Sequence, residues 1–309
     1  MINKKKFVFW RKLSGDLVED NFAMKTEYHA FFAKCNEHFD FRISSGTDSY
    51  AGDGIFTNVF KYKDWKIVPA ESKFKPDVAY QYTKVAGDNF DNAIPLIDSF
   101  QFKNWCPDKW NQYGLLSDLM PMSFLIKNKD DLRKYLEEIK TLKAVIKPRR
   151  GQKGENIVIF NKTLFPEIDE NILNTKGYIL QDFYDTNIAI PSVVSGLHDI
   201  KLITIGNNVF ANLRVPEVGK EFCTYDSPYT EIQIKQLPKE ALEIHKKVKE
   251  RINALFPNQL YTVDIGMTKN GPIVFELNSH TAFPYIHFEY AEKFFSAIIR
   301  HIDSVSLGK

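Results

Sequence analysis

Three oxygen-bearing side chains near the C-terminus have the types and the spacing to bind a hard divalent cation. Asp264 lies in the apolar run YTVDIGM, and Glu276 and Asn278 lie in the run PIVFELN. The two runs are joined through Asn270-Gly271, which favours a hairpin turn because both residues tolerate positive φ. Residues two apart on a strand face the same side, so Glu276 and Asn278 converge and Asp264 meets them from the partner strand. A few protein oxygens, completed by water and phosphate, are the ligands that Mg²⁺ prefers.

The plainest alternative for these side chains is a hairpin with one face open to water. Charged residues mostly lie on protein surfaces, so any one of the three, considered alone, fits that alternative better. A metal site that also binds phosphate would need cationic partners, and other parts of the chain contain candidates for that role.

A strand that ends in a lysine is the first of these candidates. The run AVIK ends at Lys147, and the segment RRGQKGEN that follows Pro148 combines glycines with cations before a strand resumes at Ile157. This strand–loop–strand flap differs from the strand–loop–helix of a Walker loop, and the pattern GxxxxGK[ST] is absent from the sequence. Flexible backbone N–H groups together with Lys and Arg suit a polyphosphate, and an exposed basic hairpin tip is the equal alternative.

A second hairpin, predicted from the runs HDIKLITIG and VFANLRVP, carries charges inside apolar strands. Asp199 and Lys201 interrupt the first strand, and Arg214 interrupts the second. A single cation in a strand usually faces water. Two cations in adjoining strands, each bracketed by apolar residues, favour a functional cleft.

The remaining pattern divides the chain into three regions that would position these groups. Residues 1–102 mix short strands with a helix and predict a small α/β lobe. Residues 103–183 contain the lysine-ended strand and two helices, the second of which is capped by Asn128. Residues 184–309 contain both charged hairpins and two amphipathic helices, the first of which begins at Pro238.

The composition excludes several classes of protein. With 309 residues, 44% of them hydrophobic and 26% charged, the chain is typical of a globular protein with two or three lobes. The formal net charge of +2 predicts neither a nucleic-acid nor a membrane partner. The chain has no apolar run near the roughly 20 residues that a membrane helix needs, and its basic N-terminus lacks the apolar region of a signal peptide. The spacing of Cys35, Cys106 and Cys223 fits neither a zinc site nor a disulfide framework, so we expect a cytoplasmic protein. The sequence leaves open whether the protein forms a homo-oligomer.

Taken in order, the charged motifs resemble the ATP-grasp superfamily, in particular its glutathione synthetase and RimK-like carboxylate–amine ligases, over about residues 103–285. No single motif is specific, but six of them occur in the family's order and spacing. The resemblance implies an α/β (α+β) fold. Residues 1–102 would form the pre-ATP-grasp domain, 103–183 the central flap subdomain, and 184–309 the antiparallel-sheet subdomain that binds metal and substrate.

The resemblance also implies roles for individual residues. Arg214 and Lys201 would be catalytic, and Mg²⁺, with Mn²⁺ as an alternative ion, would bind the Asp-Glu-Asn set named above. Lys109, which follows Asp108, and Lys147 would bind ATP phosphates. The other residues expected to bind the nucleotide lie in the flap, in the adenine hinge and at the start of the second charged hairpin: Arg150, Gly151, Gly154, Gln181, Asp182, Phe183 and Asp199.

The sequence departs from the family pattern in two places where substrate would be bound. After Asn278 the family often has a Pro-Gly turn, whereas this chain continues with Ser279 and His280. After the arginine strand the family often has an Asn and a paired Gly, whereas this chain has the run FCTYD at 222–226. Ser279 and His280 are the candidate substrate contacts, and a structural role is the alternative for His280.

The reaction implied by the resemblance is ATP-dependent joining of a carboxylate to an amine through an acyl phosphate, with release of ADP. The substrates would be small molecules or peptides. Two alternatives stay open at this point. A phosphotransferase of the same fold would make a stable phosphorylated product, and a non-catalytic module would bind a nucleotide or a peptide without turnover.

Overall fold

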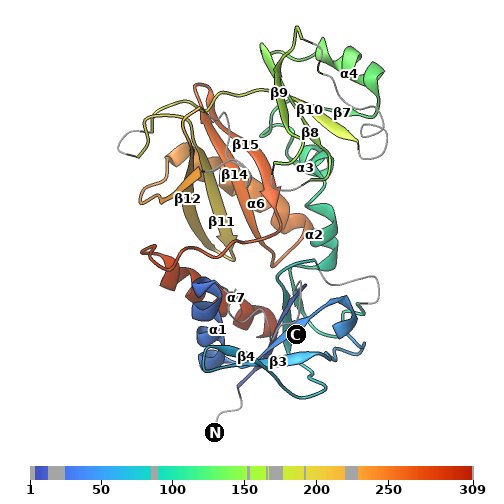
Figure 1. The fold of residues 1–309 in the computed structure, drawn as a ribbon, viewed down its shortest axis with the longest axis vertical. Helices are drawn as coiled ribbons and strands as arrows, with labels where there is room; N and C mark the ends of the chain where they lie inside the picture. Colours follow the sequence, from blue (N-terminus) through green and yellow to red (C-terminus); the bar gives the residue numbers. More distant parts are fainter. Residues whose placement is uncertain are drawn as a thin grey trace.

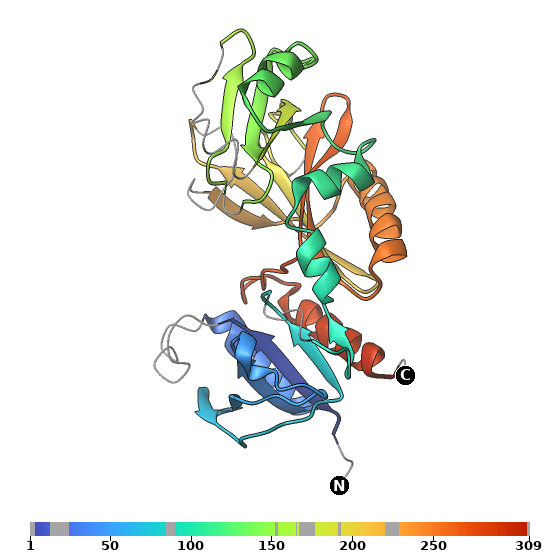
Figure 2. The ribbon, with the colours of Figure 1, turned by 90° about the vertical axis from the view of Figure 1, so that its right-hand side faces the viewer.

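The computed structural model describes residues 4–12, 25–84, 90–151, 154–164, 166, 177–190, 193–219 and 229–307. These residues form a six-stranded, a four-stranded and a five-stranded sheet. The six-stranded sheet lies at one end of the molecule, the five-stranded sheet in the middle and the four-stranded sheet at the other end (Figures 1 and 2). The mixed α/β fold with an antiparallel C-terminal sheet agrees with the expectation from the sequence.

The first lobe is built around a central strand, β1, whose run FVFW is buried on both faces. Parallel strands with both faces covered have continuous apolar runs, and β1 pairs in parallel with both β2 and β5. The sheet order is β4-β3-β2-β1-β5-β6. The elements are β1 (Lys6–Arg11), α1 (Thr26–His38), β2 (Asp40–Ser45), a 3₁₀-helix (Thr47–Ser49), β3 (Val59–Lys63), β4 (Lys66–Pro69), β5 (Val78–Gln81) and β6 (Leu96–Ile97).

Two short helices lead from the first lobe into the four-stranded sheet. In that sheet all neighbouring strands are antiparallel, in the order β7-β10-β8-β9. The Asn128 side chain accepts a hydrogen bond from the Asp131 N–H at 2.8 Å, so the predicted N-cap is confirmed. The elements are α2 (Phe100–Trp105), α3 (Lys109–Leu116), β7 (Ser123–Ile126), α4 (Lys129–Leu136), β8 (Lys143–Pro148), β9 (Val158–Asn161) and β10 (Tyr178–Asp182).

The five-stranded sheet joins the two charged hairpins side by side. It is antiparallel throughout, in the order β13-β12-β11-β14-β15. Helix α6 packs its apolar stripe against one face, which leaves the opposite face free to carry polar side chains. The elements are β11 (Asp199–Ile205), β12 (Asn208–Pro216), β13 (Tyr229–Gln233), α6 (Lys239–Leu255), β14 (Leu260–Thr268) and β15 (Gly271–Asn278).

The last helix, α7 (Ala291–Leu307), returns to the first lobe and packs beside α1 (Figure 2). Three of the described elements were not predicted from the sequence, namely the 3₁₀-helix Thr47–Ser49, helix α2 and strand β13. Helix α2 is too short to show a helical period, although Ser99 caps it by accepting from the Phe102 N–H. Strand β13 alternates intermediate and exposed residues and so carries no continuous apolar signal. Within the described ranges, no helix is long and apolar enough to span a membrane.

Candidate active site

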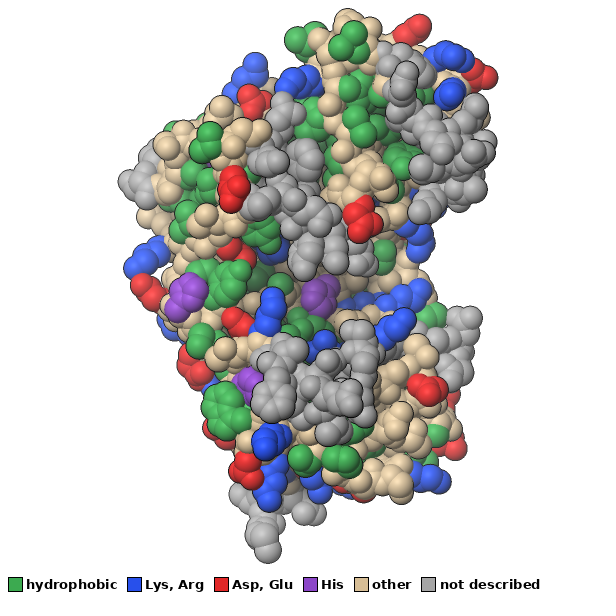
Figure 3. Space-filling model, viewed as in Figure 1, with side chains coloured by type: hydrophobic (Ala, Val, Ile, Leu, Met, Phe, Trp, Pro, Cys, Tyr) green, Lys and Arg blue, Asp and Glu red, His purple; other side chains and the backbone are tan. Residues whose placement is uncertain are grey.

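A cavity of about 960 Å³ lies between the five-stranded sheet, the four-stranded sheet and the end of β5. Figure 3 shows the molecule hollowed between the first lobe and the middle sheet, with Lys and Arg side chains along the depression. Every site residue that the sequence predicted lines this one cavity: Lys109, Lys147, Arg150, Gly151, Gly154, Gln181, Asp182, Phe183, Asp199, Lys201, Arg214, Asp264, Glu276, Asn278, Ser279 and His280.

The β14–β15 hairpin brings the three oxygen-bearing residues together. Asp264 pairs with Glu276 across the hairpin, and Thr262 pairs with Asn278. The Asn278 Nδ2 atom donates to Asp264 Oδ2 at 3.4 Å. The predicted convergence on one face is therefore what the structure contains.

The second oxygen of Asp264 shows that this set fits a metal ion. Asp264 Oδ1 is buried and has no hydrogen-bond partner among the described residues. A buried carboxylate oxygen without a partner is costly, and a cation would satisfy it. No group of three His, Cys, Asp or Glu side chains in the described part of the chain is placed to hold a metal. A cation here would thus depend on the Asn278 amide and on phosphate or water oxygens, as is usual for Mg²⁺.

Arg214 connects the two charged hairpins through carboxylates. Its Nε and Nη2 atoms contact the two oxygens of Asp199 at 2.6 and 2.9 Å, and Nη2 lies 2.9 Å from Asp264 Oδ2. Burial alone would lower the pKa of Arg214, but the charges of Asp264 and Asp199 outweigh it and raise the pKa well above its usual value. A permanently charged guanidinium with bidentate geometry is suited to bind anionic oxygens.

Two lysines approach Glu276 and its neighbour from the other side of the cavity. Lys109 Nζ lies 3.0 Å from Glu276 Oε1 and 3.1 Å from the Gly151 carbonyl. Lys147 Nζ donates to the Phe275 carbonyl at 3.3 Å. Burial lowers the pKa of Lys147 to about 8, even though Glu276 acts in the opposite direction. Both ammonium groups thus lie beside the candidate metal ligands.

The sequence interpretation gave Asp108 only as the residue before Lys109. In the structure Asp108 links the flap to α3. It is buried and accepts from the Trp110 N–H as the N-cap of the helix. Its Oδ2 atom lies 2.8 Å from Arg149 Nη2 and 3.2 Å from Arg150 Nη2. Arg150 therefore belongs to an ion pair at the start of the flap. Residues 152 and 153, which follow Gly151 in the flap, lie outside the described part of the chain.

The predicted adenine hinge is a buried strand end with its polar groups engaged. Gln181 donates to Ser123 Oγ at 2.6 Å. Asp182 Oδ1 accepts from the Lys140 N–H at 2.8 Å. The Phe183 N–H donates to Thr141 Oγ1 at 3.0 Å. These contacts fix the strand edge that faces the cavity and give Asp182 a supporting role, which the sequence pattern did not indicate.

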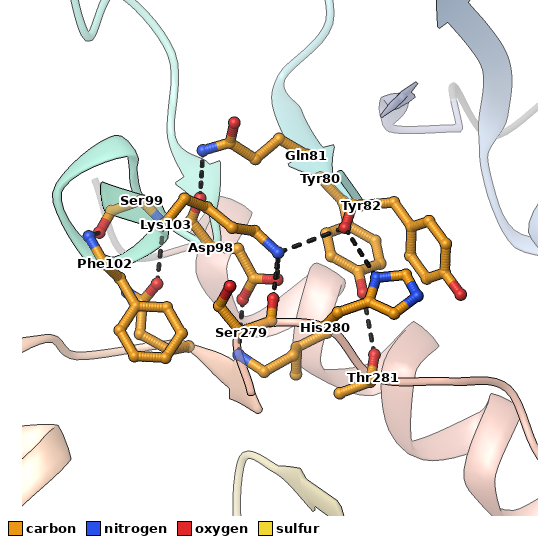
Figure 4. Close-up of polar contacts among 12 residues, drawn as sticks. Tyr80, Gln81, Tyr82, Asp98, Ser99, Phe102, Lys103, Ser279, His280 and Thr281 are labelled. Carbon is orange, nitrogen blue, oxygen red and sulfur yellow. Dashed lines mark hydrogen bonds and ion pairs between the residues drawn. The ribbon is translucent and has the colours of Figure 1, made fainter. Parts of the chain in front are cut away.

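The loop after Asn278 is held against the first lobe by a buried ammonium group (Figure 4). Lys103 Nζ donates to the carbonyls of Ser279 and Tyr82 and lies 2.9 Å from Asp98 Oδ2. His280 contacts the same Tyr82 carbonyl through Nδ1 at 3.2 Å, and its ring packs against the Tyr82 ring at 4.3 Å. No sequence signal pointed to Lys103 or Tyr82. The divergent run at 222–226 lies outside the described residues.

The chain belongs to the ATP-grasp family, because the model of the ATP-grasp domain matches residues 106–282. Three solved structures of similar fold extend the likeness to nearly the whole chain. D-alanyl-alanine synthetase A from Vibrio cholerae has a TM-score of 0.63 at 9% identity and covers 99% of both chains. VanG D-Ala:D-Ser ligase from Enterococcus faecalis has a TM-score of 0.65 at 14% identity and covers 98% of this chain and 100% of its own.

The third is the ATP-grasp ligase PsnB, solved with a phosphomimetic variant of minimal precursor, Mg and ADP. Its TM-score is 0.61 at 13% identity, with 97% of this chain and 100% of that chain covered. A search of curated protein sequences finds no match. At these identities the three structures show that the fold is shared.

Proposed function

We propose that this protein is an ADP-forming ligase that joins a carboxylate to an amine at the expense of ATP. The observation that supports this most is the convergence in one cavity of Asp264, Glu276 and Asn278 with Lys109, Lys147 and Arg214. Membership of the ATP-grasp family supports nucleotide binding there. By their names, one of the similar structures is a D-alanyl-alanine synthetase, another is a D-Ala:D-Ser ligase, and a third is a ligase with a variant of its minimal precursor bound.

The nucleotide would lie between the four-stranded sheet and the β14–β15 hairpin. The adenine base of the nucleotide would contact Gln181, Asp182 and Phe183. The phosphates would be held by Lys109 and Lys147. Mg²⁺, or Mn²⁺ in its place, would be held by Asp264, Glu276 and Asn278 and would neutralise charge on the phosphate oxygens. The flap from Arg150 to Gly154 would cover the phosphates and exclude water from the intermediate.

The proposed chemistry has two steps. A carboxylate oxygen of the first substrate attacks the γ-phosphorus of ATP. The bond from that phosphorus to the β-γ bridging oxygen breaks, so ADP departs and an acyl phosphate forms. The amine of the second substrate then attacks the acyl carbon, phosphate departs, and the amine loses a proton. Such transfers require charge stabilisation more than covalent help from the protein. Arg214, assisted by Lys201, would stabilise the transferring phosphoryl group and then the tetrahedral oxyanion.

The substrates would lie at the end of the cavity near the first lobe, where Ser279 and His280 line the wall together with Tyr82 and Lys84. Either small amino acids or peptides would suit this proposal. The test is an assay of ADP release by the purified protein with Mg²⁺ and ATP, supplied with pooled amino acids and peptides. ADP formation that needs both a carboxylate and an amine, with a new amide in the product, would support the proposal.

Two outcomes of the same assay would overturn it. A stable phosphorylated product in stoichiometric amount, formed without any amine, would make the protein a phosphotransferase. ATP binding without turnover across the whole pool would indicate a non-catalytic binding module. A variant with Glu276→Gln serves as the control for contaminating ATPases, because it alters one candidate metal ligand.

A further inference from the structure

The amide of Gln112 on helix α3 is joined at both ends to the backbone of strand β15. Gln112 is fully buried, at 0% exposure. Its Oε1 atom accepts from the Leu277 N–H at 2.9 Å, and its Nε2 atom donates to the Leu277 carbonyl at 2.9 Å. The second N–H of the amide donates to the Cys106 carbonyl. This network leaves one orientation for the amide, because Oε1 faces a donor and Nε2 faces two acceptors.

This contact takes the place of a neighbouring strand. Among the described strands β15 pairs with β14 alone, so every second residue of β15 directs its N–H and C=O away from the sheet. Buried backbone groups of this kind need partners. At Leu277 the Gln112 side chain supplies the donor and the acceptor that a further strand would have supplied. The outer edge of β15 is therefore held by Gln112 at Leu277, and the Val274 N–H, further from the ligand residues, donates to the Leu119 carbonyl at 2.9 Å.

Leu277 lies between two candidate metal ligands. Its side chain is buried in the core under the sheet, and Glu276 and Asn278 on either side face the cavity. Any shift or rotation of the backbone at Leu277 would carry both ligands with it. On α3, Lys109 precedes Gln112 by three residues and so lies on the same helix face, where it contacts Glu276 at 3.0 Å. One helix thus engages the ligand strand through a cation and an amide one turn apart.

We propose that Gln112 is a positioning residue for the divalent cation, and that it acts by fixing the backbone between Glu276 and Asn278. The inference deepens the proposed function and depends on its metal site. Gln112 does not line the cavity, so its role would be indirect. Partners that orient metal ligands are known to change metal affinity by about 10- to 100-fold when they are removed. The alternative is that Gln112 only satisfies a buried strand edge, in which case its loss would lower stability alone.

The experiment uses ADP as the probe and needs no knowledge of the substrates. ADP affinity is measured by calorimetry with and without Mg²⁺ for the wild type, Gln112→Met and Asn111→Met. Methionine keeps most of the length and volume of glutamine but can make none of the three backbone hydrogen bonds. Asn111 is the matched control, because it lies in the same helix and its amide donates to the Trp105 carbonyl, which is not part of β15. Urea unfolding of each variant reports stability separately.

We expect Mg²⁺ to strengthen ADP binding in the wild type and in Asn111→Met. In Gln112→Met the gain on adding Mg²⁺ should fall about tenfold or more, while ADP binding without Mg²⁺ stays within about twofold of the wild type. A full Mg²⁺-dependent gain in Gln112→Met, with only a loss of stability, would overturn this inference and leave the proposed function standing.

If ADP binding by the wild type does not respond to Mg²⁺, the metal site fails and this inference fails with it. Should Gln112→Met not fold, Gln112→Asn replaces it, because its amide is one methylene too short to make both contacts with Leu277. The same comparison then decides the matter. A loss of the Mg²⁺-dependent gain supports positioning by Gln112, and a retained gain overturns it.

Discussion

Arg214 holds one oxygen of Asp264 and leaves the other unpaired. The Arg214 Nη2 atom lies 2.9 Å from Asp264 Oδ2, whereas Asp264 Oδ1 is buried with no hydrogen-bond partner among the described residues. One oxygen is thus fixed by a cation that is part of the protein. The other oxygen is oriented and ready for a cation from outside. This division of roles within one carboxylate leads to the first two predictions.

Replacing Glu276 by glutamine should remove most of the metal-dependent activity while leaving the fold intact. The Glu276 side chain is 29% exposed, and among the described residues it forms an ion pair with Lys109 alone, so a neutral isostere should be tolerated structurally. We expect the rate of ADP formation to fall about 100-fold or more, because several kcal/mol of charge stabilisation depends on the metal. Glu250→Gln, on the outer face of α6, is the matched control. Equal rates for Glu276→Gln and the control would contradict the assignment of Glu276 as a metal ligand.

Arg214→Lys should be nearly as damaging as Arg214→Ala for turnover but milder for stability. Lysine keeps a charge beside Asp199 and Asp264 but cannot make the two contacts to Asp199 together with the one to Asp264. We expect kcat to fall by about 10² to 10³ in Arg214→Lys. Alanine would leave two buried carboxylates without their partner and so should lower the free energy of unfolding as well. Steady-state kinetics and urea unfolding separate the two effects, and a fully active Arg214→Lys would refute the catalytic role.

Binding of ATP should be accompanied by proton uptake near pH 8.5. Burial lowers the pKa of Lys147 to about 8, so this amine is largely neutral in the free protein above that pH. Phosphate oxygens nearby favour the ammonium form and therefore raise the pKa on binding. Calorimetry at pH 8.5 in two buffers of different ionisation enthalpy would measure the uptake, and affinity should weaken as pH rises through about 8. Lys147→Met should abolish the uptake; if uptake persists in that variant, another group is responsible.

The buried pair of Asp98 and Lys103 should show strong energetic coupling. Both side chains are essentially inaccessible, at 0% and 2% exposure. Lys103→Met would leave Asp98 buried without its cation and should lower the free energy of unfolding by about 3–5 kcal/mol. The double change Asp98→Asn with Lys103→Met should recover part of that loss. Urea unfolding of both single variants and the double variant gives the coupling energy, and simple additivity would show that the pair contributes no mutual stabilisation.

The protein should lose stability as pH falls from about 6.5 towards 4. Burial lowers the pKa of His245 to about 4, and its Nε2 atom lies 2.8 Å from Thr204 Oγ1. Below its ordinary pKa of 6.5 the unfolded chain binds a proton that the folded chain excludes, so acid favours unfolding. Burial lowers the pKa of His198 and His301 in the same direction. Urea midpoints at pH 7 and pH 5 should differ less in His245→Gln than in the wild type; His38→Gln, on the exposed end of α1, is the control.

Much of the cavity could be predicted because its residues lie on strands with strong local signals. The Asn270-Gly271 turn and the alternation around Glu276 and Asn278 fix the hairpin, and the structure has it at Leu260–Thr268 and Gly271–Asn278. The order of the charged motifs then identifies their common site. These signals specify local geometry. The order of the motifs, which is that of the ATP-grasp family, indicates which distant segments come together.

The residues that the sequence did not reveal act through contacts between distant parts of the chain. Lys103 and Ser279 are 176 positions apart, and Gln112 and Leu277 are 165 apart. Lys103 lies in a short helix without a clear apolar period, and Gln112 follows another polar residue. The sequence around them does not indicate that either side chain is buried. Burial of such side chains is decided by the element that packs over them, and periodicity within one segment carries no information about that element.

Helix α7 has a consequence for the order in which the chain can fold. Its side chains Phe294, Phe295 and Ile298 share one core with Phe31 and Phe32 of the first lobe. The first lobe is synthesised early, but its core is completed only when α7 has left the ribosome. Until then an aromatic surface of that lobe stays uncovered, so a chaperone that shields it, or slow growth of the nascent chain at low temperature, should raise the yield of folded protein.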